Sequence, residues 1–119
     1  MAKITLTGTA AVTLDGRAFS NAGTYIADVS DVAEQTRDVT NTYIQVSGAT
    51  TFVFLLVANL GTDDVIVRVD LGADYVNFGI PPGGHLLLPN AAEAIFENPA
   101  IRSVTSGGSR VYIAQGLAL

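Results

Sequence analysis

The chain has 119 residues, of which 49% are hydrophobic and 14% are charged, and its formal net charge is −5. This length predicts a single domain over residues 1–119. Lysine and arginine together number 6 and are scattered along the chain, so the sequence lacks the clustered positive charge that direct nucleic-acid binding requires. The absence of cysteine excludes disulfides and thiolate metal sites.

The low content of charged residues indicates assembly with other chains. Average soluble domains carry roughly 25% charged residues, and interface cores are the surfaces that lack them. The alternative is a densely buried monomer with a surface of threonine, serine, asparagine and glycine. The longest apolar run, residues 52–58, is far shorter than the ~20 residues that span a bilayer. The first residues alternate between polar and apolar, so we expect no signal peptide and no membrane segment.

Residues 3–14 predict one long strand. The even positions from Ile4 to Leu14 carry apolar residues or Gly8, and threonine is frequent at the odd positions. A hairpin turning at Gly8-Thr9 would put Ile4 and Leu6 on the opposite face from Val12, whereas one continuous strand keeps them together. We therefore expect residues 1–14 to form a long extended strand or arm that reaches a neighbouring subunit.

The next part of the chain predicts short strands between turns. Turn signals occur at residues 15–17 and 21–23, and residues 24–29 are a strand candidate. Residues 31–36 are compatible with a helical turn after Ser30 or with extended chain, and we favour the extended form. A strand over 36–46 is expected because this stretch is rich in threonine and valine, and residues 47–49 end it.

Residues 51–58 are apolar at both parities, which predicts a central strand covered on both faces. Residues 65–71 alternate, with valines on one side and Arg68 and Asp70 on the other, as in a half-buried antiparallel strand. Since a turn at residues 59–63 separates the two runs, we expect them to form a hairpin. Residues 72–79 are expected to form a loop.

The last third of the chain predicts further short strands. A rigid turn over residues 81–84 precedes a strand over 85–88, which Pro89-Asn90 ends. Residues 91–96 suit either a strand or one helical turn. Residues 101–105 and 110–115 are expected to form a hairpin around a glycine-rich turn, and the apolar tail 116–119 to dock on a partner.

These elements predict an all-β fold with seven to nine strands and hardly any helix. The architecture that suits them is an antiparallel β-sandwich, with a jelly roll preferred over an immunoglobulin-like sandwich.

No residue pattern specifies an enzyme. The one histidine, His85, follows a turn and has no nucleophile motif to work with, so a surface position is expected. Glu93 and Glu97 are close enough in sequence to lie within the ~5.5 Å that retaining glycosidases require, but the chain has no tryptophan for a sugar platform. The remaining acids near a turn fit no calcium-loop pattern; they are Asp63, Asp64, Asp70 and Asp74.

Glycine pairs and aromatic residues also suggest structural roles. Gly83-Gly84 and Gly107-Gly108 are not followed by the lysine and helix of a phosphate-binding loop, so they are interpreted as turns. Most aromatic residues occupy strand positions and are expected in the core; they are Tyr25, Tyr43, Phe52, Phe54, Tyr75, Phe78, Phe96 and Tyr112. We expect no catalytic residue, cofactor or metal.

The order of turns and strands over residues 30–115 resembles small virion proteins of tailed bacteriophages. The stretches that carry the resemblance are DVAEQTRDVT (31–40), VANLG (57–61), DVIVRV (64–69), FGIPPGGHLLLP (78–89) and SGGSRVYIA (106–114). The resemblance implies a β-sandwich virion component made in the host cytoplasm. It transfers no functional site, because these proteins have no catalytic motif.

The function expected from the sequence is that of a capsid decoration (cement) protein, which stabilises a phage head through contacts of a homo-oligomer, preferably a trimer, with the major capsid protein. A tail, neck or baseplate protein is the alternative within the same class. A carbohydrate-binding β-sandwich is the alternative from another class, and a small hydrolase ranks last. The candidate assembly contacts are Ile4, Leu6, Leu117 and Leu119.

Overall fold

The computed structural model describes residues 2–14, 16–29, 31–46, 50–90 and 96–117, and over most of residues 2–31 the description is confined to the backbone. These parts of the chain contain strands and turns and no helix. The strands are β1 (Ala2–Leu14), β2 (Arg17–Val29), β3 (Asp31–Val39), β4 (Ile44–Gln45), β5 (Phe54–Asn59), β6 (Val65–Leu71), β7 (Asp74–Ile80), β8 (His85–Pro89), β9 (Glu97–Ser103) and β10 (Ser109–Leu117).

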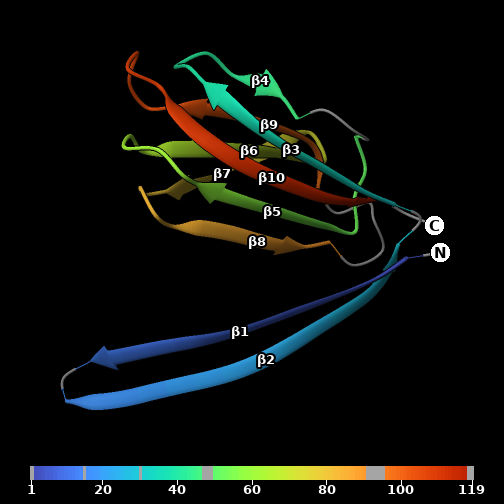
Figure 1. Ribbon diagram of the computed structural model, residues 1–119, viewed down its shortest axis with the longest axis vertical. Helices are drawn as coiled ribbons and strands as arrows, with labels where there is room; N and C mark the ends of the chain where they lie inside the picture. The colour runs from blue at the N-terminus through green and yellow to red at the C-terminus, as the bar shows by residue number, and fades with distance from the viewer. Residues whose placement is uncertain (1, 15, 30, 47–49, 91–95, 118–119) are drawn as a thin grey trace.

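Eight of the strands form a β-sandwich of two antiparallel sheets, with the orders β3-β10-β5-β8 and β4-β9-β6-β7. In Figure 1 the first of these sheets lies in front of the second. The pairs are nested along the chain, because β3 pairs with β10, β4 with β9, β5 with β8 and β6 with β7. This nested pairing is that of a chain folded once into a long antiparallel ribbon and then rolled up, which is the jelly-roll form. The predicted fold class is confirmed.

The core lies between the two sheets and consists of the inward residues of each strand. In β6 the valines are fully buried and the residues between them are half-buried, as the alternation predicts. The facing sheet contributes a matching set of aliphatic side chains, so both inner faces are apolar. The fully buried members from β5, β6, β9 and β10 are Leu55, Val57, Val65, Val67, Val69, Ile101, Val111 and Ile113.

Two predicted hairpins are wrong. Strand β5 pairs with β10 and β8, whereas β6 pairs with β7 and β9, so the turn after Asn59 carries the chain from one sheet to the other. The strands β9 and β10, which flank the glycine-rich turn, also belong to different sheets. A short turn joins neighbouring strands in either arrangement, and a jelly roll uses such turns to cross between sheets.

Three further local predictions are wrong. Residues 74–80 form strand β7 rather than a loop, and Gly72, with φ of 64°, supplies the tight turn between Leu71 and Asp74. The extended stretch 36–46 is broken after Val39 and resumes only as the short β4. The turn expected at residues 21–23 lies inside β2, where Gly23 pairs with Gly8. Residues 91–95 and 47–49 lie outside the described residues.

Two buried asparagines hold the crossing segments in place. The Asn59 Nδ2 donates to the carbonyl oxygens of Asp63 at 2.7 Å and Ile80 at 3.0 Å, and its Oδ1 accepts from Gly61 N at 3.1 Å and Ser109 Oγ at 2.7 Å. Asn59 therefore joins the turn after β5 to the end of β7 and the start of β10. These bonds provide the buried polar side chain with the partners that burial demands.

Asn90 has the corresponding role at the end of β8. Its Nδ2 donates to the carbonyl oxygens of Phe52 at 2.7 Å and Phe96 at 2.9 Å, and its Oδ1 accepts from Phe96 N at 3.2 Å. The predicted short strand behind the proline-glycine turn is confirmed as β8, with Gly83 in the left-handed region at φ of 78°.

The described residues 2–14 and 16–29 form a ribbon apart from the sandwich. Strands β1 and β2 pair antiparallel over their full lengths, from Ala2 with Val29 to Leu14 with Arg17, and make a separate two-stranded sheet. We call this ribbon the arm. It projects from the sandwich and joins it at one end (Figure 1). Strand β1 runs without a break through Gly8-Thr9, so the chain turns back after Leu14.

Candidate assembly surfaces

The arm has two chemically different faces. Because cross-strand partners lie on the same face of a ribbon, the register puts Ile4 with Ala27 and Leu6 with Tyr25 on one face. Further along, the same face carries Val12 with Phe19. The other face carries mostly threonine, alanine and serine positions, and Thr5, which is exposed, belongs to it. The arm is therefore an amphipathic ribbon.

Three of the sequence-predicted contact residues lie on strands whose ends approach each other at the base of the arm. Ile4 and Leu6 lie in the half of β1 that begins at Ala2, whose partner is Val29. Leu117, at the end of β10, pairs with Asp31, which follows the arm by two positions. The start of β1 and the end of β10 thus come close in space, although the sequence separates them by more than a hundred residues. Leu119 lies outside the described residues.

The outer face of the sheet β3-β10-β5-β8 carries a second apolar surface. Its central cross-strand row runs from Glu34 through Ala114 and Leu56 to Leu87. A hydrophobic cluster lies on this side, separate from the main core; it consists of Phe54, Ala114, Val32, Val53, Leu56 and Tyr112. Leu56 remains half-buried and Leu87 is 38% exposed.

The apolar run at residues 51–58 predicts cover on both faces of the central strand, and this is met fully on one face and partly on the other. The inward residues of β5 are buried in the sandwich core, whereas on the outer face Phe54 is buried and Leu56 and Ala58 are half-buried. Strand β5 is central in its sheet, as predicted. Its outer apolar positions are the one sequence signal that points to this surface.

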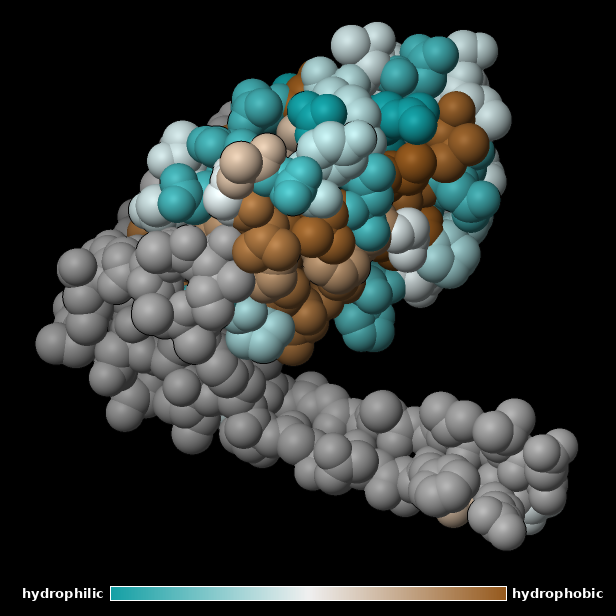
Figure 2. Space-filling model, turned by 180° about the vertical axis from the view of Figure 1, so that it is seen from behind, coloured by the Kyte–Doolittle hydropathy of each residue, from teal (hydrophilic) through white to brown (hydrophobic). Residues whose placement is uncertain are grey.

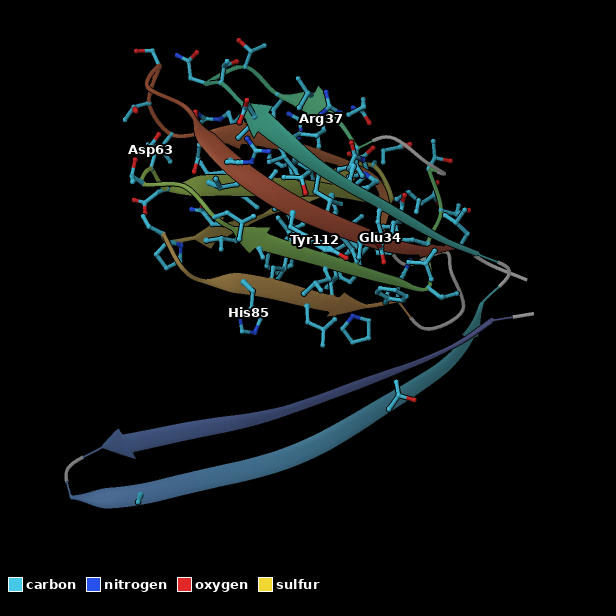
Figure 3. The ribbon with its side chains drawn as sticks, viewed as in Figure 1. Glu34, Arg37, Asp63, His85 and Tyr112 are labelled. Carbon is cyan, nitrogen blue, oxygen red and sulfur yellow. The ribbon has the colours of Figure 1, made fainter. Side chains whose placement is uncertain are left out.

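A shallow hollow of about 520 Å³ opens on the same outer face. It is lined by Glu34, Gln35, Thr36, Ala58, Leu60 and Tyr112. Glu34 and Tyr112 project from neighbouring strands on this side of the sheet (Figure 3). Burial raises the pKa of Tyr112 above 10.0, and the negative charge of Glu34 with its hydrogen bond to the phenol raises it further. The sequence does not predict this hollow, because its lining residues come from separate strands that only the pairing of the sheet brings together.

Within the described part of the chain, the candidate catalytic and metal residues form no cluster. His85 is exposed at the start of β8 and projects away from the sandwich core (Figure 3). Among the described residues, no three histidine or carboxylate groups lie close enough to hold a metal ion. Glu97 begins β9, and Glu93 lies outside the described residues. No helix in the described part of the chain is long and apolar enough to cross a membrane.

The turn acids have a structural use. Asp63 Oδ2 accepts hydrogen bonds from the backbone N of Thr105 at 2.9 Å and from its Oγ1 at 2.8 Å. The backbone bond and then the hydroxyl bond hold the pKa of Asp63 below 3.8. Asp63 thereby ties the turn after β5 to the turn after β9. Asp70 lies on the outward side of β6, where its Oδ2 accepts from Asn98 at 2.9 Å.

The aromatic residues divide between core and surface. Phe52 and Phe54 are buried as expected, but Tyr75 is 61% exposed, and Tyr43 and Tyr112 are half-buried. The expectation of a core position is therefore wrong for Tyr75, which lies in a strand at the edge of its sheet.

Neither protein-family models nor curated protein sequences show a match to this chain.

Proposed function

We propose that this protein is a structural component of a virus particle, and specifically a decoration (cement) protein on a phage head. It acts there as a homo-oligomer, preferably a trimer, that binds the major capsid protein. The observation that carries the proposal is the arm, whose two strands of 13 residues pair with each other and with no other described strand. The proposal assigns no catalytic residue, metal or cofactor.

An isolated two-stranded ribbon is marginally stable in water, so the arm needs a surface to lie on. Strands of 13 residues at ~3.3 Å each span about 40 Å, and two strands are about 10 Å wide. One face therefore has a footprint of about 400 Å² and buries about 800 Å² in total when a partner covers it. A stable interface buries about 1,600 Å², so one arm contact supplies about half of the area that such an interface needs.

The outer sheet face adds a second surface of the required kind. On this face the half-buried Leu56 lies beside the exposed Leu87. Seen from behind, the sandwich also exposes apolar surface (Figure 2). Apolar surface of this kind in a charge-poor chain favours association over a free monomer. The function would be mechanical, because many subunits that bridge neighbouring capsomers raise the barrier to rupture of the shell.

The proposal is tested by quantitative mass spectrometry of purified particles. A decoration protein is expected in hundreds of copies per head. Deletion of residues 1–8 is expected to leave the sandwich folded, because residues 2–8 pair with β2 and with no other described strand, and to abolish binding to particles. Circular dichroism of the truncated chain is the folding control. Unchanged occupancy of the truncated protein on particles would contradict the proposal.

A tail, neck or baseplate component remains the second proposal within the same class. It shares the arm and the oligomer, and differs in copy number, which would be tens or fewer per particle. The same mass spectrometry therefore separates the two positions.

A carbohydrate-binding function is favoured by one observation, the hollow beside Tyr112. Tyr112, Glu34 and Thr36 combine an aromatic ring with polar groups, as sugar sites do, and jelly rolls occur among lectins. Saturable binding on a glycan array that competing free sugar removes, and that Tyr112→Ala abolishes, would place this function first. Its absence would leave the structural proposal in place.

A further inference from the structure

The outer face of the sheet β4-β9-β6-β7 carries two arginines stacked on one tyrosine. The Cζ atom of Arg68, on β6, lies 4.2 Å from the ring centroid of Tyr43, and the Cζ of Arg102, on β9, lies 5.2 Å from the same centroid. Arg68 also lies 5.6 Å from the ring centroid of Tyr75 on β7. All of these distances are within the range of cation–π contacts. We call these four residues the arginine–tyrosine face.

The two guanidinium groups have aromatic partners in place of acidic ones. Among the described residues, neither Arg68 nor Arg102 forms an ion pair, whereas Arg110 on the other sheet lies 3.7 Å from Asp38. Asp70 is on the same face as Arg68, and its Oδ2 accepts a hydrogen bond from Asn98 rather than from an arginine. In a chain with 11 acidic and 6 basic residues, two positive charges are thus gathered with no ion-paired carboxylate among the described residues.

The exposure and composition of this face suit contact with a protein. Tyr75 is 61% exposed, while both arginines are half-buried. Tyrosine and arginine are the residues that most often dominate binding energy at protein interfaces. A guanidinium that stacks through its flat face retains in-plane N–H groups, and these match the two oxygens of a carboxylate.

We propose that the arginine–tyrosine face docks an acidic protein surface, whose aspartate or glutamate side chains pair with Arg68 and Arg102. Charge complementarity selects this partner. A nucleic acid is disfavoured because binding to its phosphate backbone requires a larger cluster of positive charges than the two arginines of this face. The face lies on the opposite sheet from the hollow beside Tyr112, and the proposal does not depend on the arm or on a virus particle.

The test uses the full-length protein, labelled with ¹⁵N, and a synthetic hexaglutamate peptide as the probe. Nuclear magnetic resonance follows the Nε–Hε signals of all arginines during titration at low ionic strength. We expect the largest shifts at Arg68 and Arg102, and little change with hexaglutamine. The variant Arg68→Gln/Arg102→Gln should weaken binding about tenfold, since each exposed ion pair contributes up to about fivefold. The matched control Arg37→Gln/Arg110→Gln should change it by less than about twofold.

Three results would overturn the proposal. One is an equal response at Arg37 and Arg110, which would indicate nonspecific attraction. Another is unchanged affinity of the Arg68→Gln/Arg102→Gln protein. The third is displacement of the peptide by a heparin hexasaccharide or an oligonucleotide of equal charge at lower concentration, which would indicate a different class of partner. If circular dichroism shows that the double variant is unfolded, binding of hexaglutamate to the Arg68→Lys protein is measured in its place. We expect about threefold weaker binding, and unchanged binding would contradict a planar pairing of the Arg68 guanidinium with a carboxylate.

Discussion

Replacing Asn59 with alanine should destabilise the sandwich strongly, because this side chain joins three segments through four hydrogen bonds. The bond to the Ile80 carbonyl is buried, and Ile80 itself is 2% exposed. A buried carbonyl without a partner costs about 1–3 kcal/mol, and the space left by the amide adds about 1 kcal/mol. The expected loss in the free energy of unfolding is therefore about 3 kcal/mol.

The loss is measured as a change in thermal midpoint and by denaturant titration. For a chain of 119 residues, about 4 °C per kcal/mol converts the loss to a decrease of about 12 °C in Tm. Asn77→Ala is the matched control, because Asn77 is exposed on β7, and it should shift Tm by less than about 2 °C. A decrease below about 3 °C for Asn59→Ala would refute the view that Asn59 holds the crossing segments together.

Two further predictions concern Asp63 and Gly116. Since the folded-state pKa of Asp63 is lowered, its contribution to stability is present above the unfolded pKa of 3.8 and is lost as the pH falls through and below that value. Tm of the native protein should therefore decrease more steeply on acidification than Tm of Asp63→Asn, which lacks the charged acceptor for Thr105. Parallel curves of Tm against pH would count against this role of Asp63. A Cβ added at Gly116 would meet the ring of Phe54, so Gly116→Ala should lose about 1–3 kcal/mol in denaturant unfolding. Gly79→Ala, with open space around it, is the control, and equal losses would exclude the clash.

The strands of this fold are largely predictable from sequence where side-chain alternation is regular. The alternation at residues 65–71 predicts β6, and the apolar run at 51–58 predicts a central strand. Their pairing is not predictable in the same way. A short turn after Asn59 is compatible with a hairpin and with a crossing between sheets, and the choice depends on which distant strands compete for each edge.

The candidate surfaces likewise divide into parts that the sequence predicts and parts that it does not. The even-position apolar residues of β1 mark the arm, whereas the return strand β2 is hidden by the turn-like Asn21-Ala22-Gly23, where opposite glycines in fact pair. The arginine–tyrosine face has no sequence signature, because Tyr43, Arg68 and Arg102 come from separate parts of the chain. Only the pairing of β4 and β6 with β9 brings them together.

The central claim is that the apolar face of the arm binds another copy of the chain, and sedimentation equilibrium of the full-length protein tests it most directly. We predict a mass that is a multiple of 12.3 kDa, preferably three times that value. Ile4→Asp/Leu6→Asp should reduce it to the single-chain mass, while Thr5→Asp/Thr7→Asp, on the opposite face of the ribbon, should leave it unchanged. A single-chain mass for the native protein at high concentration, or equal effects of the two double variants, would contradict the account.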